Sequence, residues 1–362
     1  MSFKTQALRC LSNAVIDTCD ARERTMQQQT PPQSAVMRII AGYWVSRTVY
    51  LAAKLKLADV VGDNGATLPD IAARTGTRPT ELARLMRALA SHGFFEREAD
   101  GRFVQTPLSE TLRTGTPGSM RGLAEAELGH DHYESWGDAE SCLRQGGTAF
   151  ERLYNMPVWR YYADNPATEA LFGEAMTNFT TIANSGILGS YTFKATRNVV
   201  DVGGGYGQFL ASILDQQPEA NGVLFDLPTL IGDVARKDAL TRYGNRVEVL
   251  GGDFFESVPI GGDLYLLKFI LHDWDDDHSV KILRNVRRAI ASDGKLAVVE
   301  IVLPPHNEPH IGPLIDLNMM VMTGGRERTK NEYRDLLAAA GFHLDQVVGT
   351  RSPFSVIEAS PA

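Results

Sequence analysis

The sequence predicts an α/β protein in which a doubly wound sheet forms the C-terminal half and a smaller helical domain precedes it. Three observations predict this fold. The length of 362 residues corresponds to roughly two domains. Short apolar, β-branched runs alternate with helical segments after residue 197, and helical spacing followed by a hairpin signal occupies the first third of the chain.

The composition is that of an ordinary globular protein. Hydrophobic residues make up 43% and charged residues 22% of the chain, and the net charge is −8, which excludes a disordered or disulfide-stapled chain. An acidic protein has no general attraction for nucleic acid or anionic lipid, and no apolar run approaches the ~18 residues that span a bilayer. The three cysteines form no CxxC pair and no secretory signal is recognisable. We therefore expect a cytoplasmic protein that binds neither nucleic acid nor membrane.

The N-terminal region predicts a helical domain closed by a hairpin. After a polar, glutamine-rich lead-in, helical spacing continues through two shorter helices that end before Gly76 and Gly93, residues suited to the left-handed position after a helix. Asp100-Gly101 then gives a hairpin signal, and helices followed by a hairpin are typical of a winged helix. We expect four parts: the lead-in (1–35), a winged-helix dimerisation domain (36–107), a helical segment (108–195) and the sheet domain (196–362).

The C-terminal part changes to short strands. The apolar runs are VVDVGGG, GVLFDLP, VEVLGGD, DLYLLKFIL and KLAVVEIVL. Alternation of such runs with helices is typical of a parallel, doubly wound sheet. Because these sheets bind ligands at the carboxyl ends of their strands, the side chains that follow the strands are the candidate ligand-binding residues.

A glycine-rich turn follows the first of these strands. The glycines at 203–205, with Asp201 before them, let the backbone turn sharply and approach a ligand at the N-terminus of the next helix. The spacing is GxGxG and not the GxGxxG of a dinucleotide fingerprint, because Gln208 stands where the last glycine is required. This spacing disfavours a pyrophosphate ligand and, with it, a nicotinamide-dependent dehydrogenase.

Two further acids follow the next two strands. Asp226 ends its strand and can accept both hydroxyls of a ribose, while Asp253 can accept an exocyclic amine beside Phe254, which can pack on a purine. Taken alone, Asp253 equally fits a helix N-cap followed by a core phenylalanine. Together with the glycine turn, these side chains at one sheet edge describe an adenosine site without a pyrophosphate cradle.

The chain resembles the class I S-adenosylmethionine-dependent O-methyltransferases of small molecules, which include plant caffeate-type and bacterial polyketide-tailoring enzymes. The matching motifs, in order, are DVGGGYG (201–207), FDLP (225–228), GDFF (252–255), LKFILHDWDDD (267–277) and GGRERT (324–329). The resemblance implies S-adenosylmethionine as cofactor, S-adenosylhomocysteine as product, a small aromatic acceptor with a hydroxyl group, and a homodimer formed through a winged-helix domain.

The resemblance also implies roles for single residues. Its cofactor residues are Thr180 for the carboxylate, Gly203, Gly204 and Gly205 for the methionine portion, Asp226 for the ribose, Asp253 and Phe254 for the adenine, Lys268 on the adenine side, and Asp201 and Leu227 beside these groups. Its acceptor walls are Phe172, Met176, Phe179, Asn318 and Met322 and, less directly, Trp136, although each side chain equally fits a place in the core.

The family's catalytic histidine falls on His272, with Asp273 beside it, and its two acids fall on Glu300 and Glu327. His272 follows one strand and Glu300 lies late in the next, so both side chains reach the ligand-binding edge if these strands are neighbours. A glutamate within an apolar strand is unfavourable to bury unless it is paired. Taken singly, His272 also fits an ordinary strand-end histidine, Glu300 a solvent-facing edge residue and Glu327 a solvated loop.

His272 is the expected general base of a methyl transfer to oxygen. With ordinary pKa values of about 10 for a phenol and 6.5 for histidine, proton transfer is uphill by roughly 3.5 pKa units, or ~4.8 kcal/mol. A carboxylate near the imidazole raises its pKa and narrows this gap, so Glu300 and Glu327 are expected to orient and assist the base. No His/Cys cluster has the spacing of a metal site, and HDWDDDH (272–278) is expected to cap a helix starting near Asp277. We therefore expect no metal.

Two other functions stay open at this point. The winged helix also occurs in DNA-binding regulators, but residues 66–105 carry six basic and five acidic side chains, a net charge of 6 − 5 = +1, which is a poor phosphate footprint. The family scaffold is also reused for decarboxylation or hydroxylation. The presence of His272 disfavours that reuse.

Overall fold

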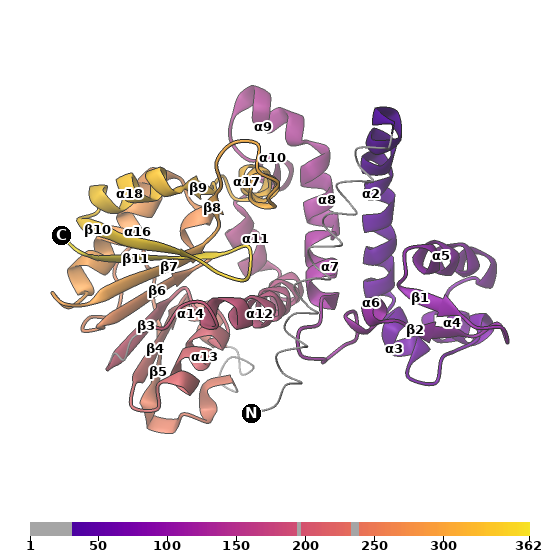
Figure 1. The fold of residues 1–362 in the computed structure, drawn as a ribbon, viewed down its shortest axis with the longest axis horizontal. Helices are drawn as coiled ribbons and strands as arrows, with labels where there is room; N and C mark the ends of the chain where they lie inside the picture. The colour runs from indigo at the N-terminus through magenta and orange to yellow at the C-terminus, as the bar shows by residue number, and fades with distance from the viewer. Residues whose placement is uncertain (1–30, 194–196, 233–238) are drawn as a thin grey trace, which may run out of the picture.

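The computed structural model describes residues 31–193, 197–232 and 239–362. The α/β fold that the sequence predicts is confirmed. Figure 1 shows a helix-covered sheet at one end of the molecule, a helical domain with a small hairpin at the other, and a group of helices between them. Most of the expected polar lead-in, residues 1–30, lies outside the described residues.

The N-terminal part contains helices followed by an antiparallel hairpin, in the expected order. Its elements are α2 (Pro32–Lys54), α3 (Leu57–Val61), α4 (Leu68–Thr75), α5 (Pro79–Ser91), β1 (Phe95–Arg97) and β2 (Phe103–Gln105). The apolar stretch over 36–61 is divided between α2 and α3 because Lys56 takes a positive φ of 50°. Helices α3 to α5 and the hairpin share one core, whereas α2 exposes a row of large apolar side chains: Val36, Met37, Ile39, Ile40, Tyr43 and Trp44.

A series of helices connects the hairpin to the sheet. They are α6 (Pro107–Glu110), α7 (Arg121–Glu127), α8 (His130–Gly137), α9 (Ala139–Gln145), α10 (Ala149–Tyr154), α11 (Val158–Asp164) and α12 (Pro166–Leu188). Helix α12 packs against α7 and also against α13 (Gln208–Gln216) of the sheet domain, so it joins the two halves of the molecule. No helix in the described part of the chain combines the length and apolarity needed to cross a bilayer.

The main sheet has seven strands in the order β10-β11-β7-β6-β3-β4-β5. These strands are β3 (Asn198–Val202), β4 (Asn221–Asp226), β5 (Val247–Gly251), β6 (Leu264–Lys268), β7 (Lys295–Glu300), β10 (Phe342–Gly349) and β11 (Ser355–Pro361). The parallel sheet that the sequence predicts is confirmed for β3 to β7, but β11 pairs antiparallel with both β7 and β10. The short turn 350–354 explains the difference, because a parallel connection requires a long crossover.

The remaining elements lie around this sheet. They are α14 (Pro228–Ile231), η1 (Gly244–Arg246), η2 (Leu271–Asp273), α16 (Asp276–Ala289), β8 (Val302–Leu303), α17 (Gly312–Met322), β9 (Arg328–Thr329) and α18 (Lys330–Ala339). Successive strand residues point to opposite faces, so Tyr265 packs with α16 and α18 while Leu264 and Leu266 pack with α12 and α13. Burial of both faces explains why the strands are continuous apolar runs.

Candidate active site

His272 lies in the one-turn helix η2, just beyond the carboxyl end of β6. The apolar run that predicts this strand extends over 263–271, but β6 ends at Lys268 because Phe269 takes a positive φ of 59° and turns the chain. Strand β7 pairs directly with β6 in parallel, as expected, and Glu300 is its last residue. The two strand ends therefore bring His272 and Glu300 together at the ligand-binding edge of the sheet.

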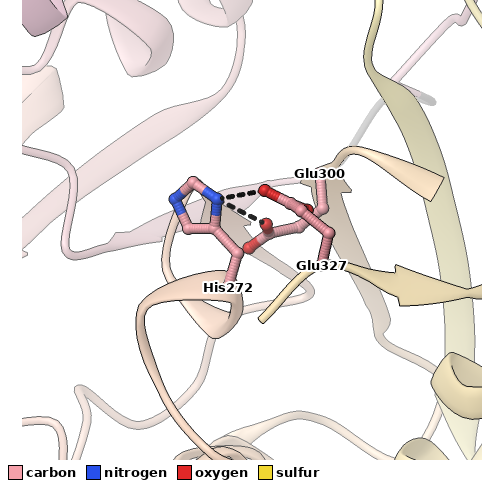
Figure 2. A group of neighbouring side chains, drawn as sticks. All are labelled: His272, Glu300 and Glu327. Atoms are coloured by element: carbon pink, nitrogen blue, oxygen red, sulfur yellow. Dashed lines mark hydrogen bonds and ion pairs between the residues drawn. The ribbon is translucent and has the colours of Figure 1, made fainter. Parts of the chain in front are cut away.

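Two buried carboxylates hold one edge of the His272 ring. Its Nδ1 lies 2.8 Å from Oε1 of Glu327 and 3.7 Å from Oε2 of Glu300. Figure 2 shows both carboxylates on the same side of the ring. Glu300 is fully buried and Glu327 is 1% exposed, so the solvated alternatives for both residues are wrong. Because a carboxylate accepts the Nδ1 proton, neutral His272 carries its basic lone pair on Nε2. Asp273 Oδ1 lies 3.8 Å from that nitrogen.

The surroundings of His272 raise its basicity. Burial lowers the pKa of the imidazole, but the negative charges of Glu300, Asp273 and Glu327 outweigh burial and raise this pKa to about 10. Burial also raises the pKa of Asp273 to about 7. Glu300 keeps its position because Oε1 accepts the backbone N–H groups of Ile270 and Leu271, at 3.0 and 2.8 Å. The pKa of His272 thus matches that of a phenol, which closes the gap expected from ordinary values.

The GGRERT segment is clamped onto the turn that carries His272. Arg326 donates its backbone N–H to the His272 carbonyl at 2.8 Å, and a Cβ at Gly325 would overlap that carbonyl oxygen. Arg328 has no exposed surface and donates to the carbonyls of Leu271 and Trp274, at 2.9 and 2.8 Å. Sequence reasoning missed Arg328 because a run of alternating charges usually lies in solvent. Its position fixes both the base and Glu327.

The acidic run after His272 caps a helix, as expected. Asp275 accepts the backbone N–H of His278 at 2.9 Å, and α16 begins at Asp276. Atoms of His272, Glu300 and Glu327 that could bind a metal ion lie within 4.8 Å of one another. The spacing of these residues along the chain does not indicate a metal site. The hydrogen bond from Nδ1 to Glu327 fits an oriented base, and the absence of a metal stays a prediction.

The glycine turn after β3 has the backbone that its sequence requires. Gly203 and Gly205 take positive φ angles of 69° and 57°, which glycine adopts without strain. A Cβ at Gly204 would overlap the side chains of Asp201 and Leu224, whereas the space beside Gly205 is open. The turn therefore packs tightly against the sheet on one side and leaves room on the other.

The other candidate cofactor residues divide into two groups. Asp226 accepts backbone N–H groups of Gly205 and Leu227, each at 2.7 Å, so its carboxylate lies beside the glycine turn. Asp253 accepts the N–H of Phe255 at 2.8 Å, which gives partial support to the capping alternative. Phe254 packs against the core on one face of the sheet and lies near Gly203.

Lys268, Thr180 and Asp201 form a polar group in which Thr180 and Asp201 are buried and Lys268 is partly buried. The Lys268 ammonium donates to Oγ1 of Thr180, on α12, at 2.8 Å. Burial lowers the pKa of Lys268 to about 7 and raises that of Asp201 to about 7. Oδ2 of Asp201 is buried without a hydrogen-bond partner in the described part of the chain. This contact groups Lys268 with the hydroxyl that the resemblance assigns to a carboxylate.

The six expected acceptor-wall residues lie in different surroundings. Trp136 donates its indole N–H to Oδ1 of Asn318 at 2.8 Å, which joins α8 to α17. Phe172 and Met176 are partly buried on α12, whereas Met322 is only 3% exposed and belongs to a core cluster. Phe179 packs edge-on against Phe354. The structure therefore brings Trp136 and Asn318 together, and the acceptor-wall role of all six residues stays a prediction.

Sequence reasoning missed two polar residues among these helices. Tyr162 is 5% exposed, and its ring contacts that of Phe172 with centroids 4.9 Å apart. His132, on α8, is also 5% exposed and makes no hydrogen bond to a described residue through Nδ1. Neither position carries a motif, because both belong to helices whose pattern reads as ordinary amphipathic sequence. Only the packing of α8, α11 and α12 shows that these polar groups are buried.

Comparison with known proteins identifies related chains. An O-methyltransferase domain matches residues 136–343, and an O-methyltransferase dimerisation domain matches residues 37–115. A phenazine O-methyltransferase, PhzM, of Lysobacter antibioticus is 42% identical over 331 residues, covering 91% of this chain and 97% of that protein. A 3-amino-4-hydroxybenzoate 4-O-methyltransferase of Streptomyces cremeus is 39% identical, with 88% of each chain covered. The crystal structure of LaPhzM has a TM-score of 0.88 and 41% identity and covers 92% of this chain and 100% of that one.

Proposed function

The chain belongs to the S-adenosylmethionine-dependent O-methyltransferase family, and from this premise we propose that it methylates a phenolic hydroxyl of a planar aromatic molecule, with His272 as general base. The observation that carries the proposal is the pairing of His272 with two buried carboxylates at the ligand-binding edge of the sheet. The match to an O-methyltransferase dimerisation domain favours dimerisation over DNA binding as the function of the N-terminal helices.

The residues around the glycine turn fit the cofactor. S-adenosylmethionine, when bound, supplies a methyl group made electrophilic by a sulfonium. Asp201, whose Oδ2 is buried and unpaired among the described residues, suits the cofactor's ammonium group, and Lys268 with Thr180 suits its carboxylate. We assign Lys268 to this carboxylate end, on the strength of its contact with Thr180, and not to the adenine side that the resemblance implies. Asp226 is left for the ribose, and Asp253 with Phe254 for the adenine.

His272 would take the proton of the acceptor hydroxyl on Nε2. With a pKa of about 10 the imidazole binds a proton as strongly as a phenol does, so transfer between them is close to thermoneutral. The same basicity means that His272 is largely protonated at neutral pH before the acceptor binds. The complex of phenolate with imidazolium and the complex of phenol with imidazole are therefore close in free energy. Glu300 and Glu327 bring them close because their negative charges stabilise the imidazolium.

Several aromatic rings favour a flat acceptor. Phe172 contacts Tyr162 and Trp159, with ring centroids 4.9 and 5.8 Å apart. Aromatic walls on α11 and α12, with the methionines of α17, suit the faces of a planar ring system. The two relatives described above are named for phenazine and aminohydroxybenzoate acceptors, both of which are planar aromatics.

We also propose that the protein is a homodimer formed through its N-terminal domain. The matched dimerisation domain includes most of α2, and this helix leaves Ile39 78% and Trp44 56% exposed. Apolar side chains in such a row are unusual on a monomer surface. Sedimentation equilibrium of the full chain should give twice the monomer mass, and a monomer mass would contradict this part of the proposal.

Two measurements test the proposed function. Calorimetry should detect S-adenosylmethionine binding by the purified chain, and labelled methyl transfer to a panel of hydroxylated aromatic acceptors should yield a labelled ether. Binding without transfer to any hydroxylated aromatic would contradict the acceptor class. Transfer to an aromatic amine in preference to the matching phenol would contradict oxygen as the acceptor atom.

A further inference from the structure

His132 is a buried histidine whose hydrogen bonds are incomplete. Its Nδ1 lies 3.6 Å from Oδ1 of Asp131, and its Nε2 lies 3.8 Å from Oε2 of Glu127. Both distances exceed that of a hydrogen bond. Nδ1 is buried without a hydrogen-bond partner among the described residues, and the side chain as a whole is only 5% exposed. A buried polar atom without a partner is unfavourable, so this nitrogen is available to a ligand and can donate when it carries a proton.

The ring lies on the side of α8 that belongs to the acceptor site. His132 and Trp136 are four residues apart on α8 and therefore share one helix face. Trp136 on that face donates to Asn318 of α17, so His132 also lies on the side of α8 that faces the substrate-side helices. Helix α8 packs against α10 and α17, in agreement with this placement.

Tyr162 connects this region to the catalytic centre. Burial raises the pKa of its phenol, and the charges of Asp131, Glu127 and Asp273 raise it further. Tyr162 is thus within electrostatic range of the acids flanking His132 on one side and of the neighbour of His272 on the other. Its ring also contacts Phe172 on α12. Tyr162 is therefore electrostatically coupled to the surroundings of both histidines.

The charges around His132 decide which chemical group it can hold. Burial lowers the pKa of the imidazole, but Glu127 and Asp131 outweigh burial and raise it. These two acids lie 3.8 and 3.6 Å from the ring nitrogens, one near each nitrogen. The guanidinium of Arg121, on the adjacent α7, is already paired with Glu125 and Glu174. A carboxylate on the acceptor molecule would therefore be repelled by Glu127 and Asp131. An uncharged heteroatom of the acceptor could accept a hydrogen bond from the ring.

We propose that His132 is a specificity residue that donates a hydrogen bond to a second, uncharged heteroatom of the aromatic acceptor, such as a ring nitrogen or a quinone carbonyl, and that Glu127 and Asp131 exclude a carboxylate from this position. This inference rests on the proposed function, because it concerns the same acceptor site. It narrows the acceptor class to planar phenols that carry a neutral hydrogen-bond acceptor away from the methylated oxygen.

A matched pair of acceptors tests the hydrogen bond. 1-Hydroxyphenazine and 1-hydroxyanthracene have the same shape and differ in the two ring nitrogens. Their dissociation constants are measured by calorimetry on the full chain in the presence of S-adenosylhomocysteine, so that the result does not depend on turnover. The wild-type chain should bind the phenazine roughly tenfold more tightly, the worth of one hydrogen bond.

Two variants assign this preference to His132. His132→Leu removes the donor and should reduce the preference to about twofold or less by weakening only phenazine binding, whereas His132→Gln keeps an N–H and should retain most of the preference. In turnover, His132→Leu should raise KM for the phenazine and leave kcat nearly unchanged. A 6-hydroxyphenazine-1-carboxylate probe should bind the wild type more weakly than 1-hydroxyphenazine does and should improve in Asp131→Asn.

The outcomes separate this inference from the proposed function. Three results would each overturn the role of His132. The wild type could bind the two tricyclic probes equally, His132→Leu could keep the preference unchanged, or the wild type could bind the carboxylate probe more tightly than 1-hydroxyphenazine. An equal loss for both probes in His132→Leu would show a merely structural role, and thermal melting of the variant identifies that case. Binding of the probes without methyl transfer would overturn the proposed function instead.

Discussion

Two histidines with acidic neighbours, the partly buried His272 and the buried His132, differ in how well their surroundings satisfy the ring nitrogens. The Nδ1 of His272 is 2.8 Å from Glu327, and the neighbouring Glu300 is fixed by two backbone N–H groups. Around His132 the corresponding distances to Asp131 and Glu127 are 3.6 and 3.8 Å, and Nδ1 is buried without a hydrogen-bond partner among the described residues.

This difference separates a group that is fixed before the acceptor arrives from one that the acceptor completes. A general base must hold its lone pair in one direction, and the clamp of Arg328 on the His272 turn serves that need. A specificity group gains from an unsatisfied donor, because only a ligand with the matching atom pairs it. Substitutions around His272 should therefore reduce both the stability and the rate of the enzyme. Substitutions around His132 should reduce only the affinity for the acceptor.

The largest expected effect is that of His272→Gln. The side chain keeps a polar group but loses the base, and turnover should fall by roughly 10²–10⁴-fold. Cofactor affinity, measured by calorimetry, should stay within a factor of about three, because no cofactor group is assigned to His272. Turnover of the variant at the wild-type rate would remove His272 from its proposed role.

Gly325→Ala should disturb the packing of the segment 324–329 on the turn that carries His272. The new methyl group would overlap the carbonyl oxygen of His272, and backbone on both sides of the contact prevents easy relaxation. We expect a loss of about 1–3 kcal/mol in the free energy of unfolding, measured by urea titration. Gly137→Ala is the matched control, because a Cβ at that helix position meets nothing within 4 Å. Equal stability of the two variants would show that the clamp is not tight.

Glu300→Gln should change the pH dependence of the rate. In the wild type the neutral form of His272 increases as pH rises from 7 toward its pKa of about 10, so kcat/KM should rise over this range. The charge of Glu300 is the largest single cause that raises the His272 pKa, so its removal lowers this pKa and moves the rise in kcat/KM to lower pH. The amide oxygen still accepts both backbone N–H groups, and we expect roughly tenfold lower turnover at the optimum. A rise at unchanged pH would exclude Glu300 as the main electrostatic partner.

The comparison also shows how far sequence reasoning reaches. The base and one of its acids could be placed together because His272 follows β6 and Glu300 ends the neighbouring β7, and parallel strands bring their carboxyl ends to one edge. His132 and Tyr162 lie on short helices. The pattern of apolar and polar residues in these helices does not distinguish a functional side chain from one that packs in the core. Arg328 could not be recognised as buried, because burial of an arginine depends on three carbonyl and carboxylate partners from distant positions.

Tyr162→Phe should have the smallest effect and tests the other half of the comparison. The hydroxyl makes no hydrogen bond in the part of the chain that the structure describes, and the ring contacts with Phe172 and Trp159 persist without it. Removal of a hydroxyl that makes no hydrogen bond should leave the melting temperature unchanged or raise the stability by up to ~1 kcal/mol. Arg328→Lys, which loses several paired donors, serves as the contrasting variant and should melt several degrees lower. A clear loss of stability in Tyr162→Phe would mean that the polar groups near His132 are already paired in the free protein, and the division between a fixed side and a ligand-completed side would then fail.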